Sequence, residues 1–182
     1  MKEIKSMFAL LRNVKSRTLQ PGEILINEGS NSKELFFIRK GLIRCFYINS
    51  NADEITFQLF PESNLVLNFH TLLFEEPSKF VYNAYEQTKV YMIEYDFLMK
   101  LTGENPYFLE LNRSFVGKRA MKQAFMRIES LVFLTPEERY IKYLKDYPNI
   151  VNRAPDKYIA NVLGITPESL SRIRNRIATR KR

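Results

Sequence analysis

The side chains best suited to specific chemistry lie near the end of the chain, after Thr166. Arg172 falls one turn into a predicted helix, where an arginine can reach O6 and N7 of guanine with two parallel hydrogen bonds. Arg176, Arg180 and Lys181 follow near the exit of that helix, where cations suit the phosphates of a nucleic-acid backbone. The segment therefore predicts binding of DNA, with one arginine reading bases and the later cations contacting phosphates.

The segment Asp156–Ile177 has the pattern of a helix-turn-helix that would position these side chains. Ala160 is small where the second helix must cross closely, and Gly164 occupies the turn, where a left-handed backbone is needed. Thr166 is the predicted N-cap of the second helix, and Pro167 its first residue. Apolar residues at helical spacing are predicted to face inward: Ile159, Val162, Leu163, Ile165, Leu170, Ile173 and Ile177. The outer face is left to Glu168, Ser169, Arg172, Asn175 and Arg176. A helical hairpin without a DNA-binding role is the alternative.

Charge is distributed unevenly along the 182 residues. Residues 1–116 have 13 Lys/Arg against 14 Asp/Glu, whereas residues 117–182 have 15 against 6. A near-neutral part joined to a small basic part is typical of a sensor or scaffold attached to a nucleic-acid reader. On charge alone, a basic solvated tail remains the alternative.

The composition excludes most catalytic and metal chemistry. The chain has one histidine, His70, and one cysteine, Cys45, so neither a His-based metal centre, a Cys-rich zinc site nor a disulfide framework is expected. The sequence contains no paired-carboxylate or Ser/His/Asp set and no glycine-rich phosphate loop. We interpret His70 as structural or surface-exposed and Cys45 as a small buried hydrophobic residue. No enzyme activity, catalytic residue, metal site or cofactor is expected.

Residues 21–94 have the pattern of short β-strands. Runs of β-branched and aromatic residues alternate with glycine or Asx turns, which indicates an all-β barrel, roll or sandwich. The predicted strands are Glu23–Asn27, Glu34–Arg39, Leu42–Ile48, Glu54–Phe60, Phe80–Tyr85 and Lys89–Glu94. Gly22, Gly29 and Gly41 are predicted at positions that need positive φ or close strand approach. Between residues 62 and 79 a short helix is predicted from apolar residues at helical spacing: Leu65, Phe69, Leu72 and Leu73.

The second half is predicted to be helical. A short helical turn at Asp96–Lys100 is expected to be broken at Thr102 and Gly103. A long helix then begins at Pro106, with Asn105 as its N-cap, and runs to about residue 134. Another helix follows, with Thr135 as N-cap and Pro136 at its first position, and continues to about residue 146.

The long helix carries an apolar stripe formed by Met121, Phe125, Ile128 and Val132. This spacing suits a coiled-coil-like seam between two copies of the chain. The apolar surface is wider than that of an ordinary surface helix, so the helix is either buried by its own chain or faces its β domain on one side and a partner on the other. The stripe is the predicted dimer interface.

The chain resembles the Crp/Fnr superfamily of bacterial transcription regulators over roughly residues 19–177. The resemblance is carried by PGEILINEGSNSKELFFIRKGLIRCFY (Pro21–Tyr47), EEPSKFVYNAYE (Glu75–Glu86) and, most specifically, IANVLGITPESLSRIRNRI (Ile159–Ile177). It implies a cupin-like β-roll of the cyclic-nucleotide-binding type, a long dimerisation helix and a C-terminal helix-turn-helix.

The resemblance also implies roles for residues of the recognition helix. Glu168 and Arg172 match base-reading positions, and Ser169, on the same outer face, is grouped with them as a base reader. Thr166 and Ser169 match hydroxyl positions that touch phosphate. The remaining predicted backbone contacts are Asn175, Arg176, Arg180 and Lys181.

The sequence departs from the family's nucleotide pocket. In nucleotide-binding members a Gly-Glu pair and a following arginine hold the ribose and the cyclic phosphate. Here the pair aligns with Leu67 and Asn68, and the arginine with Ser78, so a buried phosphate would lack its charge-assisted partners. The polar contacts from the dimer helix would fall near Ala124 and Phe125, which cannot replace them. Binding of cyclic AMP is therefore not expected, and the ligand remains unknown.

The predicted fold class is α+β, with an antiparallel β-roll (residues 1–105), a dimerisation helix (106–134) and a helix-turn-helix bundle lacking most or all of a wing (135–182). The predicted function is a homodimeric transcription regulator that binds a two-fold symmetric operator. The alternative is a β-roll ligand-binding or protein-interaction module without sequence-specific DNA reading.

Double-stranded DNA and a second copy of the chain are the expected partners. RNA polymerase is a candidate, and the effector is an unknown small molecule or none. No apolar run reaches about 18 residues and no secretory signal is present, so a cytoplasmic protein without membrane contact is expected.

Overall fold

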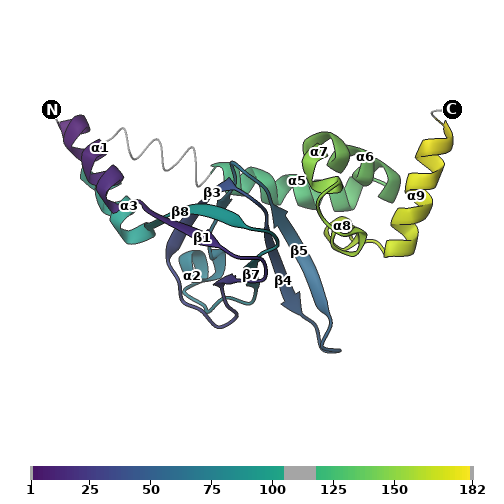
Figure 1. The fold of residues 1–182 in the computed structure, drawn as a ribbon, viewed down its shortest axis with the longest axis horizontal. Coiled ribbons are helices and arrows are strands. Elements are labelled where there is room, and N and C mark those ends of the chain that lie inside the picture. The colour runs from purple at the N-terminus through teal and green to yellow at the C-terminus, as the bar shows by residue number, and fades with distance from the viewer. Residues whose placement is uncertain (1, 105–117, 181–182) are drawn as a thin grey trace.

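The computed structural model describes residues 2–104 and 118–180, with the strands in the first part and most of the helices in the second (Figure 1). The strands are β1 (Lys15–Leu19), β2 (Ile24–Ile26), β3 (Glu34–Lys40), β4 (Ile43–Ile48), β5 (Glu54–Phe60), β6 (Leu65–Val66), β7 (Val81–Ala84) and β8 (Thr88–Glu94). The helices are α1 (Lys2–Asn13), α2 (Phe69–Phe74), α3 (Tyr95–Glu104), α5 (Arg119–Phe133), α6 (Pro136–Asp146), α7 (Pro148–Val151), α8 (Asp156–Leu163) and α9 (Pro167–Arg180). This arrangement confirms the predicted α+β fold class.

The strands form two four-stranded antiparallel sheets that enclose the first core. Their orders are β1-β8-β3-β6 and β2-β7-β4-β5, so strands distant in sequence lie side by side. The core between them consists of Leu19, Ile26, Phe36, Ile38, Ile43, Cys45, Val66, Tyr82, Ala84 and Val90. The predicted β-roll is thereby confirmed, and with it the burial of Cys45.

Gly41 shows why the β-roll needs glycine at a turn. Its φ is +105°, and a Cβ at this position would lie 2.7 Å from Cα of Thr88 and 2.8 Å from the carbonyl oxygen of Gln87. Any side chain would collide with the backbone of the neighbouring turn. Gly22 and Gly29 also have positive φ, which confirms the predictions for these turns.

The prediction of one helix between residues 62 and 79 is wrong in its first half. Leu65 and its neighbour Val66 form β6 and pair with Phe37 and Phe36 of β3. The helix that remains, α2, begins only after Asn68, whose side chain accepts a hydrogen bond from the N–H of Thr71. Residues 65 and 66 lie in a segment with the spacing of a helix, but their pairing with β3, about thirty positions earlier, makes them a strand instead.

Three further elements near the β-roll differ from expectation. Helix α3 continues through Thr102 and Gly103 to Glu104, so these residues do not end the helix at Lys100. Strand β1, which pairs with β8 over its whole length, precedes the first predicted strand. Helix α1 was likewise not anticipated.

The boundaries predicted for the helical half are confirmed where they are described, but the short helix α7 was not among the predictions. Helix α5 ends at Phe133, as expected, whereas its predicted start at Asn105 and Pro106 lies outside the described residues. The side chain of Thr135 accepts from the N–H of Glu138, and the Glu138 carboxylate accepts from the N–H of Thr135 at 2.8 Å. This capping box confirms the predicted N-cap of α6.

The second core joins the helical half to the β-roll. It contains residues of α6, α7, α8 and α9 and of the α7–α8 connection, together with two from the β-roll: Leu42, Leu59, Tyr140, Tyr143, Ile150, Ala154, Ile159, Ala160, Val162, Leu163, Leu170 and Ile173. Because one apolar cluster spans both parts, the helix-turn-helix has a defined position on the β-roll.

Candidate DNA-binding surface and β-roll pocket

The turn between α8 and α9 has the geometry that the sequence predicts. Gly164 ends α8 in the left-handed region, at φ 66° and ψ 38°, and the N–H groups of Gly164 and Ile165 donate to the last carbonyls of that helix, both at 3.0 Å. A Cβ at Gly164 would lie 3.3 Å from Cδ2 of Leu131, so the turn also lies close to α5. Oγ1 of Thr166 accepts from the N–H of Ser169 at 3.2 Å. The predicted turn and N-cap are confirmed.

Helix α9 has one buried face and one exposed face. Leu170 and Ile173 are buried against α6 and α8, and Ile177 packs beside them. Four of the predicted contact residues are exposed and Ser169 is half-buried at the edge: Glu168, Ser169, Arg172, Asn175 and Arg176. The structure thus places these residues on the outer face of a helix that lies at one end of the molecule (Figure 1).

Arg172 and Glu168 are available to an external partner. Arg172 makes no hydrogen bond or ion pair within residues 2–104 and 118–180, and it lines a groove between α9 and the start of α6. Hydrogen bonds from the Glu168 backbone N–H and from Thr166 hold the pKa of the Glu168 carboxyl below its ordinary value. The charge of Arg172 also favours the ionised carboxylate, so the face carries one cation without a hydrogen bond or salt bridge among the described residues and one ionised acid nearby.

Arg176 and Arg180 are not unpaired, and this is a feature that the sequence analysis missed. Both donate to the carboxylate of Glu137 in the first turn of α6, at 2.9 and 2.5 Å. The sequence marks Glu137 only as an acidic residue near a helix N-terminus, a position that the helix dipole favours. Lys181, another predicted phosphate contact, lies outside the described residues.

Arg174 points into the protein. Its Nη1 donates to both carboxylate oxygens of Asp156, at 2.6 and 2.7 Å, and its Nε donates to the Tyr140 hydroxyl at 3.0 Å. These bonds join α9 to α8 and α6. Arg174 therefore holds the helix-turn-helix together.

Polar contacts fix the helix-turn-helix on the β-roll. Helix α8 packs on β5, and the N–H of Thr56 donates to Oδ1 of Asn161 at 3.2 Å. Arg153 donates to both carboxylate oxygens of Glu62 at 3.0 Å and is also paired with Glu86. Partial burial opposes ionisation of Glu62, but hydrogen bonds from Arg153 and the Gly41 N–H outweigh it and lower the Glu62 pKa to about 2.

Arg44 forms a second junction between the two parts. The side chain is buried, and its guanidinium lies between the rings of Phe46 and Tyr158, 4.2 and 4.0 Å from their centroids. It donates to Oγ1 of Thr56 at 2.9 Å and to Glu54 at 2.6 Å. Because Tyr158 belongs to α8, this stack joins β4 to the helix-turn-helix.

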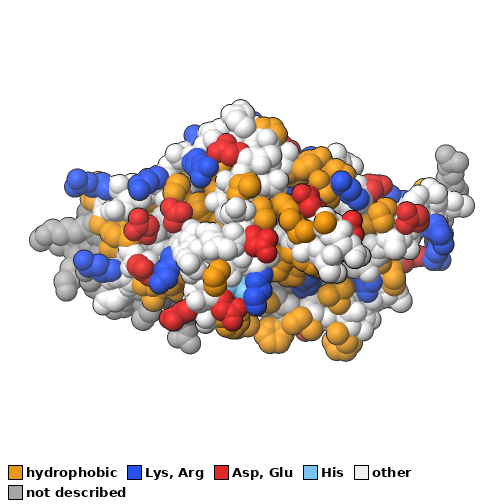
Figure 2. Space-filling model, turned by 90° about the horizontal axis from the view of Figure 1, so that it is seen from below, with side chains coloured by type: hydrophobic (Ala, Val, Ile, Leu, Met, Phe, Trp, Pro, Cys, Tyr) orange, Lys and Arg blue, Asp and Glu red, His pale blue; other side chains and the backbone are white. Residues whose placement is uncertain are grey.

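The apolar stripe of α5 is open in the single chain. Between 57% and 67% of the surface of its four members is exposed: Met121, Phe125, Ile128 and Val132. Large hydrophobic side chains protrude along one edge of the molecule (Figure 2). Four large apolar residues in one row on a helix exceed what scattered surface hydrophobics explain.

The three positions that the resemblance aligns with the nucleotide cassette are all buried. Leu67 is buried. Asn68 is fully buried and donates through Nδ2 to the carbonyl of Ser30 at 3.0 Å and to Oγ1 of Thr71. Oγ of Ser78 donates to the carbonyl of Phe80 at 2.7 Å. The polar groups at Asn68 and Ser78 are thus used within the protein.

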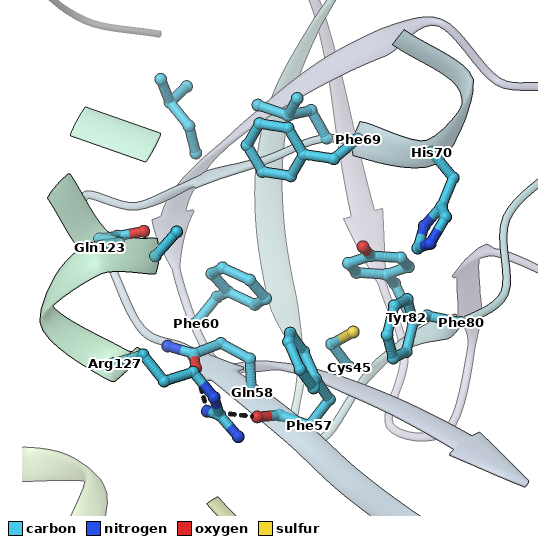
Figure 3. Close-up of a pocket in the computed structure, with 13 residues that line it drawn as sticks. Cys45, Phe57, Gln58, Phe60, Phe69, His70, Phe80, Tyr82, Gln123 and Arg127 are labelled. Carbon is cyan, nitrogen blue, oxygen red and sulfur yellow. Dashed lines mark hydrogen bonds between the residues drawn. The ribbon is translucent and has the colours of Figure 1, made fainter. Parts of the chain in front are cut away.

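A cavity of about 260 Å³ lies next to these positions, between the β-roll and α5 (Figure 3). Most of its lining is apolar: Cys45, Phe57, Phe60, Leu65, Leu67, Phe69, Phe80, Tyr82 and Ala124. The polar contributors are Gln58, His70, Gln123 and Arg127. We call this cavity the β-roll pocket.

His70 and Cys45 both line the β-roll pocket. His70 is half-buried, with its ring centroid 5.4 Å from that of Phe80, and it is visible as the pale blue patch in Figure 2. Burial raises the pKa of the Cys45 thiol to about 12, so it is protonated at neutral pH. Among residues 2–104 and 118–180, no group of three or more His, Cys, Asp or Glu side chains could hold a metal ion. Over the same ranges, no helix combines the length and apolar character needed to cross a bilayer.

Comparison with known proteins identifies the fold. Residues 16–105 match the cyclic nucleotide-binding domain family. A comparison with curated proteins gives no match. Among solved structures, FixK2 from Bradyrhizobium japonicum is similar with a TM-score of 0.75 and 16% identity, over 92% of this chain and 86% of FixK2.

Two other regulators have the same fold. The c-di-GMP responsive global regulator CLP from Xanthomonas campestris aligns with a TM-score of 0.71 and 14% identity, over 98% of this chain and 93% of CLP. A CRP/FNR family transcriptional regulator from Thermus thermophilus aligns with a TM-score of 0.69 and 14% identity, over 91% and 87% of the two chains. This protein therefore has a cyclic nucleotide-binding-type domain at residues 16–105 and, over nearly its whole length, the fold of the Crp/Fnr transcription regulators.

Proposed function

We propose that the protein is a homodimeric, DNA-binding transcription regulator that acts in the cytoplasm on a two-fold symmetric operator. Residues 1–105 are the sensor or scaffold, residues 106–134 the dimerisation segment and residues 135–182 the DNA-binding unit. The observation that carries the proposal is helix α9, which is anchored by Leu170 and Ile173 and presents Glu168 and Arg172 outward. A recognition helix needs this arrangement to enter a major groove.

In this proposal the residues of α9 divide into base readers and backbone contacts. Arg172, which is unpaired among the described residues, reads a guanine, while Glu168 and Ser169 contact neighbouring bases. The backbone contacts are Thr166, Asn175, Arg176, Arg180 and Lys181. Phosphate contacts of this kind set the register on the duplex, and base contacts set the sequence.

The exposed stripe of α5 supports the dimer. Met121, Phe125, Ile128 and Val132 would be buried if the α5 helices of two copies packed against each other. A two-fold axis along this seam places the two recognition helices symmetrically, and half-sites on one face of B-DNA lie about 34 Å apart or a multiple of that distance.

The β-roll pocket does not suit cyclic AMP. Leu67 offers no charge, and the polar atoms of Asn68 and Ser78 are bonded to the protein's own backbone. We expect cyclic AMP and cyclic GMP to bind weakly or not at all. Calorimetric titration that finds micromolar affinity for either nucleotide contradicts this part of the proposal.

Selection from a pool of random duplexes tests the function directly. The full chain is mixed with the pool, bound duplexes are recovered by mobility shift, and the enriched sequences are read. We expect enrichment of a site with two-fold symmetry. Binding without enrichment, or no binding at low salt, would favour a ligand-binding or protein-interaction module that does not read DNA sequence.

A further inference from the structure

Among the described residues that line the β-roll pocket, Arg127 is the one Lys or Arg, and it also lines a second, more polar cavity that includes Lys142 and Asp146. It projects from α5 at one end of the β-roll pocket, and burial lowers the pKa of its guanidinium. Its guanidinium carbon lies 4.5 Å from the centroid of the Phe57 ring. Among residues 2–104 and 118–180, no carboxylate is paired with it. Its charge is offset by neutral hydrogen-bond acceptors and a ring face, so a negative group here would add a charge-assisted bond.

The hydrogen bonds of Arg127 leave part of its guanidinium available. Nη1 donates to the carbonyl of Phe57 at 2.8 Å and to Oε1 of Gln58 at 3.1 Å. Within the described ranges its other two nitrogens, Nε and Nη2, make no hydrogen bond. A planar guanidinium can still give two parallel bonds to a carboxylate.

The β-roll pocket is divided into a polar end and an aromatic body. Arg127, Gln123 and Gln58 lie on the side of α5, whereas rings occupy the rest of the space (Figure 3). Four of these rings are phenylalanines: Phe57, Phe60, Phe69 and Phe80. The rings of Phe57 and Phe80 are in contact, with centroids 4.7 Å apart. A flat ring system would gain stacking contacts here that a sugar phosphate would not.

We propose that the β-roll pocket binds a small aromatic carboxylic acid, with its ring system among the phenylalanines and its carboxylate on Arg127. The cyclic phosphate of a nucleotide lacks a partner at Ser78, which does not line the pocket, whereas a carboxylate at the α5 side meets the guanidinium. The ligand thus differs in chemical class from a cyclic nucleotide and enters with its charge toward the dimerisation helix.

This assignment gives the proposed regulator a physical link between ligand and DNA, and in that respect it rests on the proposed function. Arg127 donates hydrogen bonds to Phe57 and Gln58 of β5. Helix α8 packs on the same strand, where the N–H of Thr56 donates to Asn161 of α8. A carboxylate on Nε and Nη2 leaves Nη1 on its two β5 oxygens, so the ligand and β5 are joined through one guanidinium. The strand that the ligand contacts is therefore the strand on which the helix-turn-helix is docked.

The test is calorimetric titration of the full chain with 2-naphthoate, 2-naphthamide and cyclic AMP. The amide has the same ring system without the charge. We expect 2-naphthoate to bind about tenfold more tightly than 2-naphthamide, because a charge-assisted pair is lost in the amide. Equal affinity for acid and amide, tighter binding of cyclic AMP than of 2-naphthoate, or no binding of 2-naphthoate at millimolar concentration each overturns the proposal.

Variants of Arg127 test whether this residue binds the carboxylate of the ligand. Arg127→Gln is expected to remove the preference for the acid, whereas Arg127→Lys retains part of it. Lys122→Gln is the matched control, because Lys122 is an exposed cation of the same helix that does not line the pocket. If Lys122→Gln lowers the affinity as much as Arg127→Gln, the site is elsewhere and the proposal is wrong. The comparison of acid with amide on the unaltered protein holds even if an Arg127 variant does not fold.

The same preparations are titrated with a duplex recovered by selection. DNA binding without 2-naphthoate binding rejects the ligand and leaves the regulator intact. Binding of 2-naphthoate without any DNA binding supports the pocket and rejects the regulator. The two failures are thus distinguishable.

Discussion

At the scale of single residues, Arg172 and the arginines that follow it differ in their partners. Arg172 is unpaired among the described residues, whereas Arg176 and Arg180 are both bonded to Glu137. We expect Arg172→Ala to cost roughly 1–3 kcal/mol per half-site on the selected operator and to relax preference at one base position. Arg176→Ala and Arg180→Ala should weaken binding to every sequence about equally. Titrations on cognate and scrambled duplexes check this; equal losses on both duplexes for Arg172→Ala would show that it contacts only phosphate.

Glu137 controls how available two of these arginines are. DNA phosphates must compete with its carboxylate for Arg176 and Arg180. We expect Glu137→Gln to raise affinity for any duplex by about two- to tenfold, since both arginines are exposed and ion pairs of exposed side chains are individually weak. The dependence of affinity on salt should also become steeper by about one unit for each additional phosphate that the arginines bind.

The control for Glu137→Gln is Glu129→Gln, which removes one exposed negative charge on α5. It should leave both the affinity and the salt dependence close to those of the unaltered protein. Weaker DNA binding by Glu137→Gln would mean that Glu137 holds the arginines in place for DNA instead of competing for them.

At the scale of elements, α5 has an exposed apolar face that a second copy of the chain would bury. Phe125 lies in the middle of the stripe, so Phe125→Glu would place two like charges in the seam of the proposed dimer. We expect a loss of several kcal/mol in dimerisation free energy, roughly 3–5. Sedimentation should then find monomers at micromolar concentration. Lys122→Glu introduces the same side chain outside the stripe and should leave the dimer intact; a monomeric unaltered protein at that concentration would refute the seam.

At the scale of the whole molecule, Arg153 joins the helical half to the β-roll through Glu62 and Glu86. The ordinary pKa of 4.5 for Glu62 is lowered to about 2 in the folded protein. A lowered carboxyl pKa stabilises the fold above the unfolded pKa, and that stability is lost as the pH falls toward the folded pKa. The relevant window is therefore about pH 5 to 2. Because the group is partly exposed, we expect a contribution of only about 1–2 kcal/mol.

Denaturant unfolding at pH 6 and pH 3 checks this expectation. Glu62→Gln should reduce the difference in unfolding free energy between the two pH values. Lys79→Gln, which removes the partner of the exposed Glu76, should change that difference little. An unchanged pH dependence in Glu62→Gln would show that the junction does not contribute in this way.

The sequence by itself determined the features that depend on bonds between residues close along the chain. Thr166 caps α9 through Ser169, three positions on, and Thr135 caps α6 through Glu138. Gly164 is required because the left-handed turn excludes a Cβ without strain. Such interactions are fixed by local spacing and side-chain chemistry, so the helix-turn-helix and the outer face of α9 could be predicted residue by residue.

Only the tertiary structure decided which distant residues meet. Leu65 belongs to a strand because β3 supplies its hydrogen-bonding partners, and this outweighs a helical spacing that is only locally favourable. Arg153 meets Glu62 and Glu86, and Arg127 meets the rings of the β-roll pocket, across separations of about 65 to 90 positions in the sequence. Nothing in the local spacing of charges or phenylalanines predicts such encounters, because chain topology sets them. The candidate DNA surface was therefore predictable, whereas the contents of the pocket and the docking of the two parts were not.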